Sequence, residues 1–384
     1  EPELPSDVEP YDPEHPEDLY EDQLYAKSAI LIEASSGEVI FEKNADATMY
    51  PASTTKIMTV LLGIMMGDMN QTVYLSQTAA DIGDDSSDMG LDVGESINFK
   101  DLLYGTMVRS ANEGANLIAE TLYGSVPAFA EVMNEAAAMY GCTGTHFANA
   151  NGLHDPNHYT TARDMAKIAQ AAMQNETFRD IAKTYTYHLP ASNLHSARVL
   201  TSSSRAFFNP SLEENDAYYP YAIGIKTGFT RAAGRCLVFG ARRDGLEVIG
   251  VVLNCANWFD EAARLMDLGF ERYEGFTALS EGETVRVLPV TDGTQDTVYI
   301  CAGADLTAPV PKGEIPSLEY DMPDSLPAGM QMGDAVGEAR LLLDGRTLAS
   351  VPLVLTESLT PRDYAFELER VLRSWPLQSE PLSE

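Results

Sequence analysis

Apolar residues recur along the chain at spacings that predict strands in some segments and helices in others. Apolar runs bounded by turn residues predict strands at 28–33 and 38–42, which a turn at 35–37 joins into a hairpin. Apolar residues three and four positions apart predict helices at 53–66, 99–107, 111–123, 126–139 and 162–173. The chain therefore opens with a short β-hairpin and continues as a mainly helical region.

Strand-like segments return after residue 219. We expect strands at 221–226, 235–240 and 247–253, and the turn at 242–245 joins the last two into an antiparallel hairpin. A helix is predicted at 260–273. Because the order is strands, helices, strands and a helix, we expect an α+β fold. Its antiparallel sheet would pair its first strands with its last and be packed with helices.

The pattern predicts two further segments after this region and one before it. Short strands alternate with Gly, Pro and Asp turns from 274 to 359, which indicates a small all-β domain; the strands are expected at 284–290, 296–301, 340–343 and 349–355. A helix is predicted at 361–375, within a tail at 360–384 that frays at its end. The main domain is assigned to 26–273 and an acidic leader to 1–25.

Charge changes this picture at the leader. The chain has 384 residues, with 58 Asp and Glu against 25 Lys and Arg, for a formal charge of −33. Such a chain is a poor candidate for binding DNA or RNA, because nucleic-acid binding depends on Lys and Arg contacts to phosphates.

The segment 1–22 holds ten acids, five prolines and no Lys or Arg, so we expect the leader to be disordered. Without an initiator Met or an apolar start, we expect that a signal peptide was removed or that the sequence was trimmed.

The cysteines and histidines give no indication of a metal. Cys142, Cys236, Cys255 and Cys301 fit neither a CxxC site nor a dense disulfide framework, so we expect small buried apolar residues, with one disulfide left open. His154 and His158 are four apart but flank the turn at 155–157, which is the wrong geometry for a shared ligand. We expect no metal and no cofactor.

The first candidate motif is Ser53-Thr54-Thr55-Lys56, at the start of a predicted helix. Positions three apart share a helix face, so the Ser53 hydroxyl and the Lys56 amine can meet. A serine is a weak nucleophile until a base takes its proton, and lysine is a base only when neutral. Its pKa must then fall by roughly three units, about 4 kcal/mol, through burial or a nearby cation. By itself, Ser-x-x-Lys is more often an accidental surface pair.

Two more motifs follow in order. In Ser110-Ala111-Asn112 the hydroxyl can pass a proton to a leaving amine and the amide can bind a peptide carbonyl, although helix capping explains the pair equally well. In Lys226-Thr227-Gly228, at a predicted strand end, the glycine admits a substrate backbone. Lys226 and Thr227 together can hold a carboxylate, and the Lys226 charge favours a neutral Lys56. By itself this motif reads as a strand end and a turn.

The conjunction is far more specific than its parts, because these three motifs together mark β-lactamases and penicillin-binding proteins. The sequence further resembles the D-alanyl-D-alanine carboxypeptidases, which are low-molecular-mass serine penicillin-binding proteins. Four stretches carry the resemblance: 51–59, 110–116, 147–153 with 159–164, and 224–230. It covers 26–269 well, and the β-rich segment resembles the small C-terminal domain of the family more loosely.

The resemblance assigns roles to these residues. It implies that Ser53 is the acylated nucleophile, Lys56 its base and Ser110 a proton relay, while Asn112 binds the substrate backbone. Lys226, Thr227 and Gly228 would bind the substrate, with the two side chains on its terminal carboxylate. The backbone N–H groups of Ser53 and Phe229 would form the oxyanion hole, worth about 3 kcal/mol per donor in comparable hydrolases.

The resemblance also implies a fold and a function. The fold would be the β-lactamase/transpeptidase-like antiparallel sheet flanked by helices, followed by the small all-β domain. The enzyme would be a hydrolase that removes the terminal D-alanine of peptidoglycan stem peptides through an acyl-enzyme and is inhibited covalently by β-lactams. It would act in cell-wall biogenesis and cell shape, exported to the cell wall or the outer face of the cytoplasmic membrane.

The tail and two rival functions leave alternatives open. Members of the family often end in a membrane anchor, but residues 362–373 carry balanced charges rather than a basic face, so we expect an anchor absent from this sequence. A β-lactamase needs a device such as a Glu-oriented water, and no Glu-x-x-x-Asn occurs between the second and third motifs; Glu176 stands in Asn-Glu-Thr-Phe. A wall-binding protein that has lost its activity would not need an intact Ser53, Lys56 and Lys226.

Overall fold

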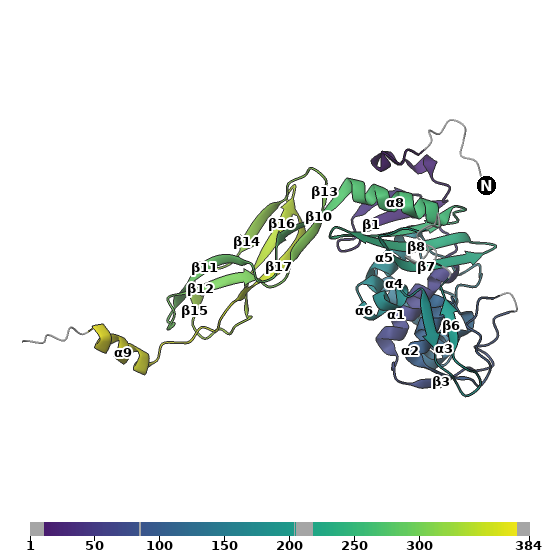
Figure 1. Ribbon diagram of the computed structural model, residues 1–384, viewed down its shortest axis with the longest axis horizontal. Coiled ribbons are helices and arrows are strands. Elements are labelled where there is room, and N and C mark those ends of the chain that lie inside the picture. Colours follow the sequence, from purple (N-terminus) through teal and green to yellow (C-terminus); the bar gives the residue numbers. More distant parts are fainter. Residues whose placement is uncertain (1–10, 84–85, 203, 205–217, 375–384) are drawn as a thin grey trace, which may run out of the picture. The chain divides into compact units, whose positions relative to one another are not determined.

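This computed structural model describes residues 11–83, 86–202, 204 and 218–374. The chain divides into an N-terminal unit, Glu1–Glu274, and a C-terminal unit, Gly275–Glu384 (Figure 1). The three motifs all lie in the N-terminal unit.

The N-terminal unit is built on a five-stranded antiparallel sheet in the order β2-β1-β9-β8-β7. Its first strand, β1, pairs along its whole length with its last strand, β9, from Ser28↔Leu253 to Glu33↔Val248. This pairing confirms the α+β arrangement predicted from the order of the elements. The bounds are β1 Ser28–Glu33, β2 Val39–Lys43, β7 Ala222–Thr230, β8 Gly234–Arg243 and β9 Leu246–Leu253.

Both faces of the sheet are buried, which explains why its strands read as nearly continuous apolar runs. Successive side chains of a strand point to opposite faces, so neighbours such as Leu31 and Ile32 enter different cores. Helix α8, Trp258–Arg272, packs its Leu265 and Met266 on one face, and the helical region covers the other (Figure 1).

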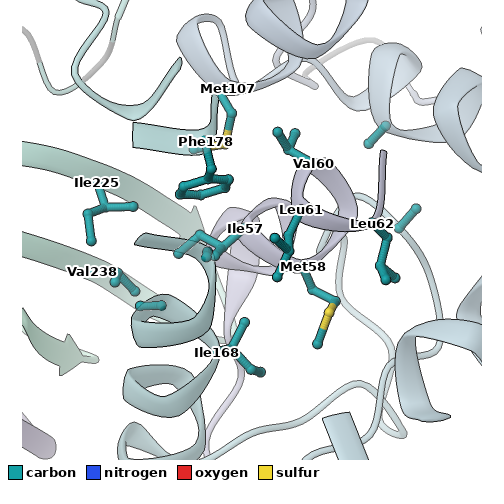
Figure 2. Close-up of a cluster of buried hydrophobic side chains, with 14 of the residues drawn as sticks. Ile57, Met58, Val60, Leu61, Leu62, Met107, Ile168, Phe178, Ile225 and Val238 are labelled. Carbon is teal, nitrogen blue, oxygen red and sulfur yellow. The ribbon is translucent and has the colours of Figure 1, made fainter. Parts of the chain in front are cut away.

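The helical region surrounds one deeply buried helix, α1 (Lys56–Met66), in which every residue from Lys56 to Gly63 is buried. Figure 2 shows Ile57 and Leu61 of α1 among Phe178, Ile168 and side chains from the sheet. The helices that enclose it are α2 Phe99–Val108, α3 Asn112–Tyr123, α4 Val126–Met139, α5 Ala162–Met173 and α6 Glu176–Ala182. Two small hairpins complete this region: β3 Thr72–Tyr74 with β4 Ser96–Asn98, and β5 Thr186–Leu189 with β6 Arg198–Thr201.

The C-terminal unit is a β structure with its own apolar core, as the spacing of its strands predicted. Its main sheet has the order β14-β16-β17-β12-β11-β15, and β10 pairs with β13. The strands are β10 Tyr273–Leu279, β11 Thr284–Thr291, β12 Thr297–Ala302, β13 Leu306–Pro311, β14 Ser317–Asp321, β15 Leu326–Pro327, β16 Ala335–Leu343 and β17 Arg346–Leu355. Helix α9, Tyr364–Ser374, falls within the predicted tail helix.

The N-terminal segment differs from the sequence-based expectation of a disordered leader at 1–25. Residues 1–10 lie outside the described part of the chain, but 11–25 contain two short 3₁₀ turns, Pro16–Asp18 and Glu21–Gln23, packed near α8. The reason is that Leu19 and Leu24 are buried there, each about 2% exposed. The average composition of the acidic segment predicts disorder because it does not register that two single apolar residues can be buried against the domain.

A buried carboxylate fastens this segment to the sheet unit. Glu261 of α8 accepts hydrogen bonds from the backbone N–H of Tyr25 and, at 3.0 Å, of Ala26. Lys43 of β2 donates to the Leu24 carbonyl at 2.5 Å. These bonds satisfy the polar groups where the chain enters β1.

The described residues also bear on the cysteines, on metal ligands and on membrane spans. All four cysteines are buried and free. Within residues 11–83, 86–202, 204 and 218–374, no group of three metal-ligating side chains gathers, and no helix has the length and apolarity to span a membrane.

Replacing Glu261 with Ala is expected to lower the free energy of unfolding by about 2 kcal/mol, because the buried N–H of Ala26 and the part-buried N–H of Tyr25 lose their acceptor. Scanning calorimetry measures the loss. Glu271→Ala, on the more exposed side of the same helix, is the control. Limited proteolysis of Glu261→Ala should also begin near residues 20–25. A cleavage pattern that is the same as in the wild type would show that Glu261 does not hold this segment in place.

Candidate active site

The first motif lies where a tight turn runs into the buried helix. Residues Ala52–Thr55 form a 3₁₀ turn, and α1 begins at Lys56, so the helix starts three residues later than predicted. Ala52 has a φ of 50°, a left-handed conformation that costs energy in a residue with a side chain. The turn keeps Ser53 half-buried at the surface while Lys56 enters the interior.

The Lys56 amine contacts three oxygens. Its Nζ lies 2.9 Å from Ser53 Oγ, 2.6 Å from Asn112 Oδ1 and 2.6 Å from the carbonyl oxygen of Asn151. A neutral amine has two hydrogens and one lone pair. It can donate to Asn112 and Asn151 and still accept the hydrogen of the Ser53 hydroxyl, which is the arrangement a general base requires.

The surroundings of Lys56 favour this neutral form. The residue is fully buried, and burial holds its pKa well below the usual 10.5. The nearby Lys226 charge lowers the pKa further, and Glu113 opposes both effects. Since none of the three contacts of Nζ is a carboxylate, no negative charge in direct contact stabilises the protonated amine.

Lys226 lies in the interior of β7, not at a strand end as predicted, because the strand continues to Thr230. Its amine is also buried and donates to the Thr227 carbonyl at 2.8 Å. Burial lowers the pKa of Lys226 to about 7. The amine is therefore partly charged at neutral pH, which suits it to bind a carboxylate that enters from solvent.

The second motif sits at the start of α3. Ser110 adopts a left-handed φ of 58°, and Asn112 is the first residue of the helix. The backbone N–H of Asn112 donates to the Ser87 carbonyl at 2.9 Å, while Glu113 Oε1 accepts from the Met89 N–H at 2.7 Å. These bonds fix the segment 87–89 beside the motif.

Two glycines allow the distant segments to come together. A Cβ on Gly228 would lie 2.9 Å from the backbone nitrogen of Ser53, so strand β7 passes directly against the turn. A Cβ on Gly152 would lie 1.9 Å from the Ala52 carbonyl oxygen, and Gly152 has a φ of 84°. Any side chain at either position would push the Ser53 turn away.

The motifs face one cleft of about 810 Å³. The residues that line it are Ser53, Gly83, Ser86, Ser87, Arg109, Ser110, Asn112, Gly152, Leu153, Thr227, Gly228, Phe229, Thr230, Arg231 and Trp258. Lys56 and Lys226 lie buried behind this lining. The structure thus brings the eight residues singled out from the sequence to one place, and the described lining contains no Asp or Glu.

Sequence reasoning missed two contributors. It gave no role to the Asn151 carbonyl, which contacts Lys56, although Asn151 lies in the Phe147–Leu153 stretch that carries the family resemblance. It also gave none to Glu113, whose buried Oε2 finds no partner in the described structure. In the same loop, Asn149 Oδ1 accepts from the Gly152 N–H at 2.8 Å, which stabilises the loop.

The remaining candidates do not belong to the site chemistry. His158 is buried, lies 2.7 Å from Thr55 Oγ1, and burial lowers its pKa to about 4. It therefore supports the turn as a neutral ring. His154 packs edge-on against Tyr50. Arg205 lies outside the described residues.

Comparison with known proteins gives consistent matches. Residues 14–257 match the model of the D-alanyl-D-alanine carboxypeptidase family, and 273–360 match that of the penicillin-binding protein 5 C-terminal domain. The chain is 30% identical to the D-alanyl-D-alanine carboxypeptidase DacF of Bacillus subtilis, across 91% of this chain and 90% of that protein. It is also 30% identical to DacA of Escherichia coli K12, across 88% and 84%.

A solved structure extends the match to the fold. Penicillin-binding protein 5 of Haemophilus influenzae is 28% identical, with a TM-score of 0.65 over 88% of this chain and 98% of that one. The likeness confirms the predicted fold: an antiparallel sheet flanked by helices, followed by a small all-β domain.

Replacing Lys226 with Met is expected to stabilise the protein at pH 7 by about 3 kcal/mol, because it removes a buried amine. The unfolded chain holds the Lys226 proton up to pH 10.5, but the folded protein loses it near pH 7. The free energy of unfolding of the wild type therefore rises with pH across that window. The difference in free energy of unfolding between Lys226→Met and the wild type should be smaller at pH 9.5 than at pH 7. Calorimetry at both pH values measures it.

Lys27→Met is the matched control, because Lys27 is exposed. It should leave the pH dependence of stability unchanged. An advantage of Lys226→Met that is the same at pH 7 and pH 9.5 would show that the amine is not strained by burial.

Proposed function

We infer, because the chain belongs to the D-alanyl-D-alanine carboxypeptidase family, that this serine peptidase removes the terminal D-alanine of peptidoglycan stem peptides through an ester on Ser53. One observation carries the proposal: a buried lysine amine, with its pKa held low, lies 2.9 Å from the hydroxyl of Ser53. A serine beside a neutral base is an activated nucleophile.

The acylation step uses the groups around Ser53. Its Oγ attacks the carbonyl carbon between the two D-alanines, and Lys56 takes the hydroxyl proton. The N–H groups of Ser53 and Phe229 stabilise the oxyanion, and the close passage of Gly228 by the Ser53 nitrogen supports this placement. When the C–N bond breaks, the leaving amine receives a proton by way of Ser110 or Lys56.

Substrate binding uses the opposite walls of the cleft. Lys226 and Thr227 hold the terminal carboxylate, and Asn112 binds the substrate backbone while its Oδ1 orients Lys56. Water then hydrolyses the ester and restores Ser53. The product is a peptide one residue shorter, which can no longer donate in cross-linking. β-Lactams acylate the same hydroxyl because they resemble the D-Ala-D-Ala amide.

The cleft also bears on the rival functions. A β-lactamase that relies on a Glu-oriented water needs a carboxylate in the cleft, and none of the described lining residues is Asp or Glu. An inactive wall-binding protein would have no need to keep the Lys56 amine on Ser53. The substrate places the enzyme outside the cytoplasmic membrane, at the cell wall.

The decisive test is release of D-alanine from diacetyl-Lys-D-Ala-D-Ala. The wild-type protein should release it, and Ser53→Ala should lose at least about 10³-fold in kcat/KM, since the nucleophile is gone. A fluorescent penicillin should form a long-lived adduct on Ser53. Rapid turnover of the label would favour a β-lactamase, and neither adduct nor D-alanine release would favour the inactive protein.

The pH dependence tests Lys56 as the base. The value of kcat/KM should fall as the pH drops through the lowered pKa of Lys56, because protonation removes the base. Replacing Glu113 with Gln removes a charge that raises this pKa, so the acid limb should move to lower pH. Glu131→Gln, an exposed change on α4, should not move it. An acid limb that moves upward in Glu113→Gln would contradict the assignment.

A further inference from the structure

The cleft contains one positively charged side chain, that of Arg231, for which the described residues show no structural role. Arg231 follows β7 directly, lines the cleft and is exposed. Among residues 11–83, 86–202, 204 and 218–374, its side chain makes no hydrogen bond, ion pair or ring contact. By contrast, Arg163, Arg179 and Arg198 each pair with one or more carboxylates, as expected in a chain with 58 acids against 25 bases.

The other charged side chain among the described lining residues, that of Arg109, already has a hydrogen-bond partner. Arg109 donates from Nε to the Asp88 carbonyl at 3.3 Å. Arg235, close to Arg231 in sequence, donates to the Ala256 carbonyl at 2.8 Å and lies over the Trp258 ring. Arg231 is therefore a free guanidinium in a cleft whose described lining has no carboxylate, and it would attract an anionic group of a ligand.

The position of Arg231 just beyond the end of β7 indicates which group of the ligand it would bind. Thr227, which the proposed function places on the terminal carboxylate, lies three residues before the end of β7, or roughly 10 Å in extended backbone, and Arg231 is the next residue after that end. A peptide extended along β7 spans roughly 8 Å from that carboxylate to the Cα of its third residue from the end. The side chain of Arg231 and the side chain of that third residue are long enough to span the remaining distance. Arg231 is thus too far away to bind the terminal carboxylate itself.

We propose that Arg231 is a specificity-determining residue that binds a carboxylate on the side chain of the third residue from the substrate's C-terminus. The preferred substrates are then stem peptides with a carboxylate-bearing diamino acid, such as diaminopimelic acid, rather than lysine at that position. This inference rests on the proposed function, because the terminal carboxylate on Thr227 sets the register.

The experiment compares two peptides that differ by one carboxylate. Both end in D-Ala-D-Ala and carry a third residue with both amines acetylated, one lysine and the other diaminopimelic acid. The wild-type ratio of kcat/KM, diaminopimelic acid over lysine, should be about five, as expected for a partly exposed charge pair. The ratio should decline at high salt.

Variants then assign the preference. In Arg231→Gln the ratio should fall to about one, and in Arg231→Glu below one through repulsion. Arg242→Gln removes an exposed arginine outside the cleft and should keep the wild-type ratio. No preference in the wild type, or a ratio that survives in Arg231→Gln, would overturn the proposal. Failure to release D-alanine from either peptide would instead overturn the proposed function.

Discussion

The burial of an amine without a contacting carboxylate is the constraint on which the site depends. Lys56 is surrounded by an apolar helix, a carbonyl and an amide, so the energetic cost of a proton there is high. The same amine in water would be protonated and useless as a base. Chemistry at Ser53 is thus a consequence of how the interior of the N-terminal unit is packed, and the second buried amine, Lys226, strengthens it.

Keeping that arrangement requires segments from across the chain. The turn before α1, the start of α3, the Phe147–Leu153 loop and strand β7 each contribute one contact to the site. Backbone strain at Ala52 and Ser110 is tolerated because the surrounding contacts hold both residues in place. The reactive centre is therefore less stable than it could be, because a site without backbone strain and without a buried amine would also lack the reactivity.

The sequence revealed much of this arrangement because the relevant signals are local. Ser53 and Lys56 are three residues apart, and the regular apolar spacing of 126–139 and 162–173 placed α4 and α5 with the observed bounds. Other features depend on tertiary contacts that no spacing encodes. The Asn151 carbonyl is backbone and leaves no side-chain signal, Lys226 proved to be mid-strand, and residues 11–25 are ordered by two leucines within an acidic segment.

The pairing of β1 with β9 has a consequence for how the chain folds. These strands lie near the beginning and the end of the N-terminal unit, with helices α1 to α6 between them. Contacts of such high sequence separation form slowly, because the long intervening segment must first be closed into a loop. Until the segment that ends at Leu253 reaches it, the apolar strand Ser28–Glu33 has no sheet partner on its β9 side. In that interval the unpaired edge of the strand is exposed to aggregation, a hazard that a helical bundle of equal size does not share.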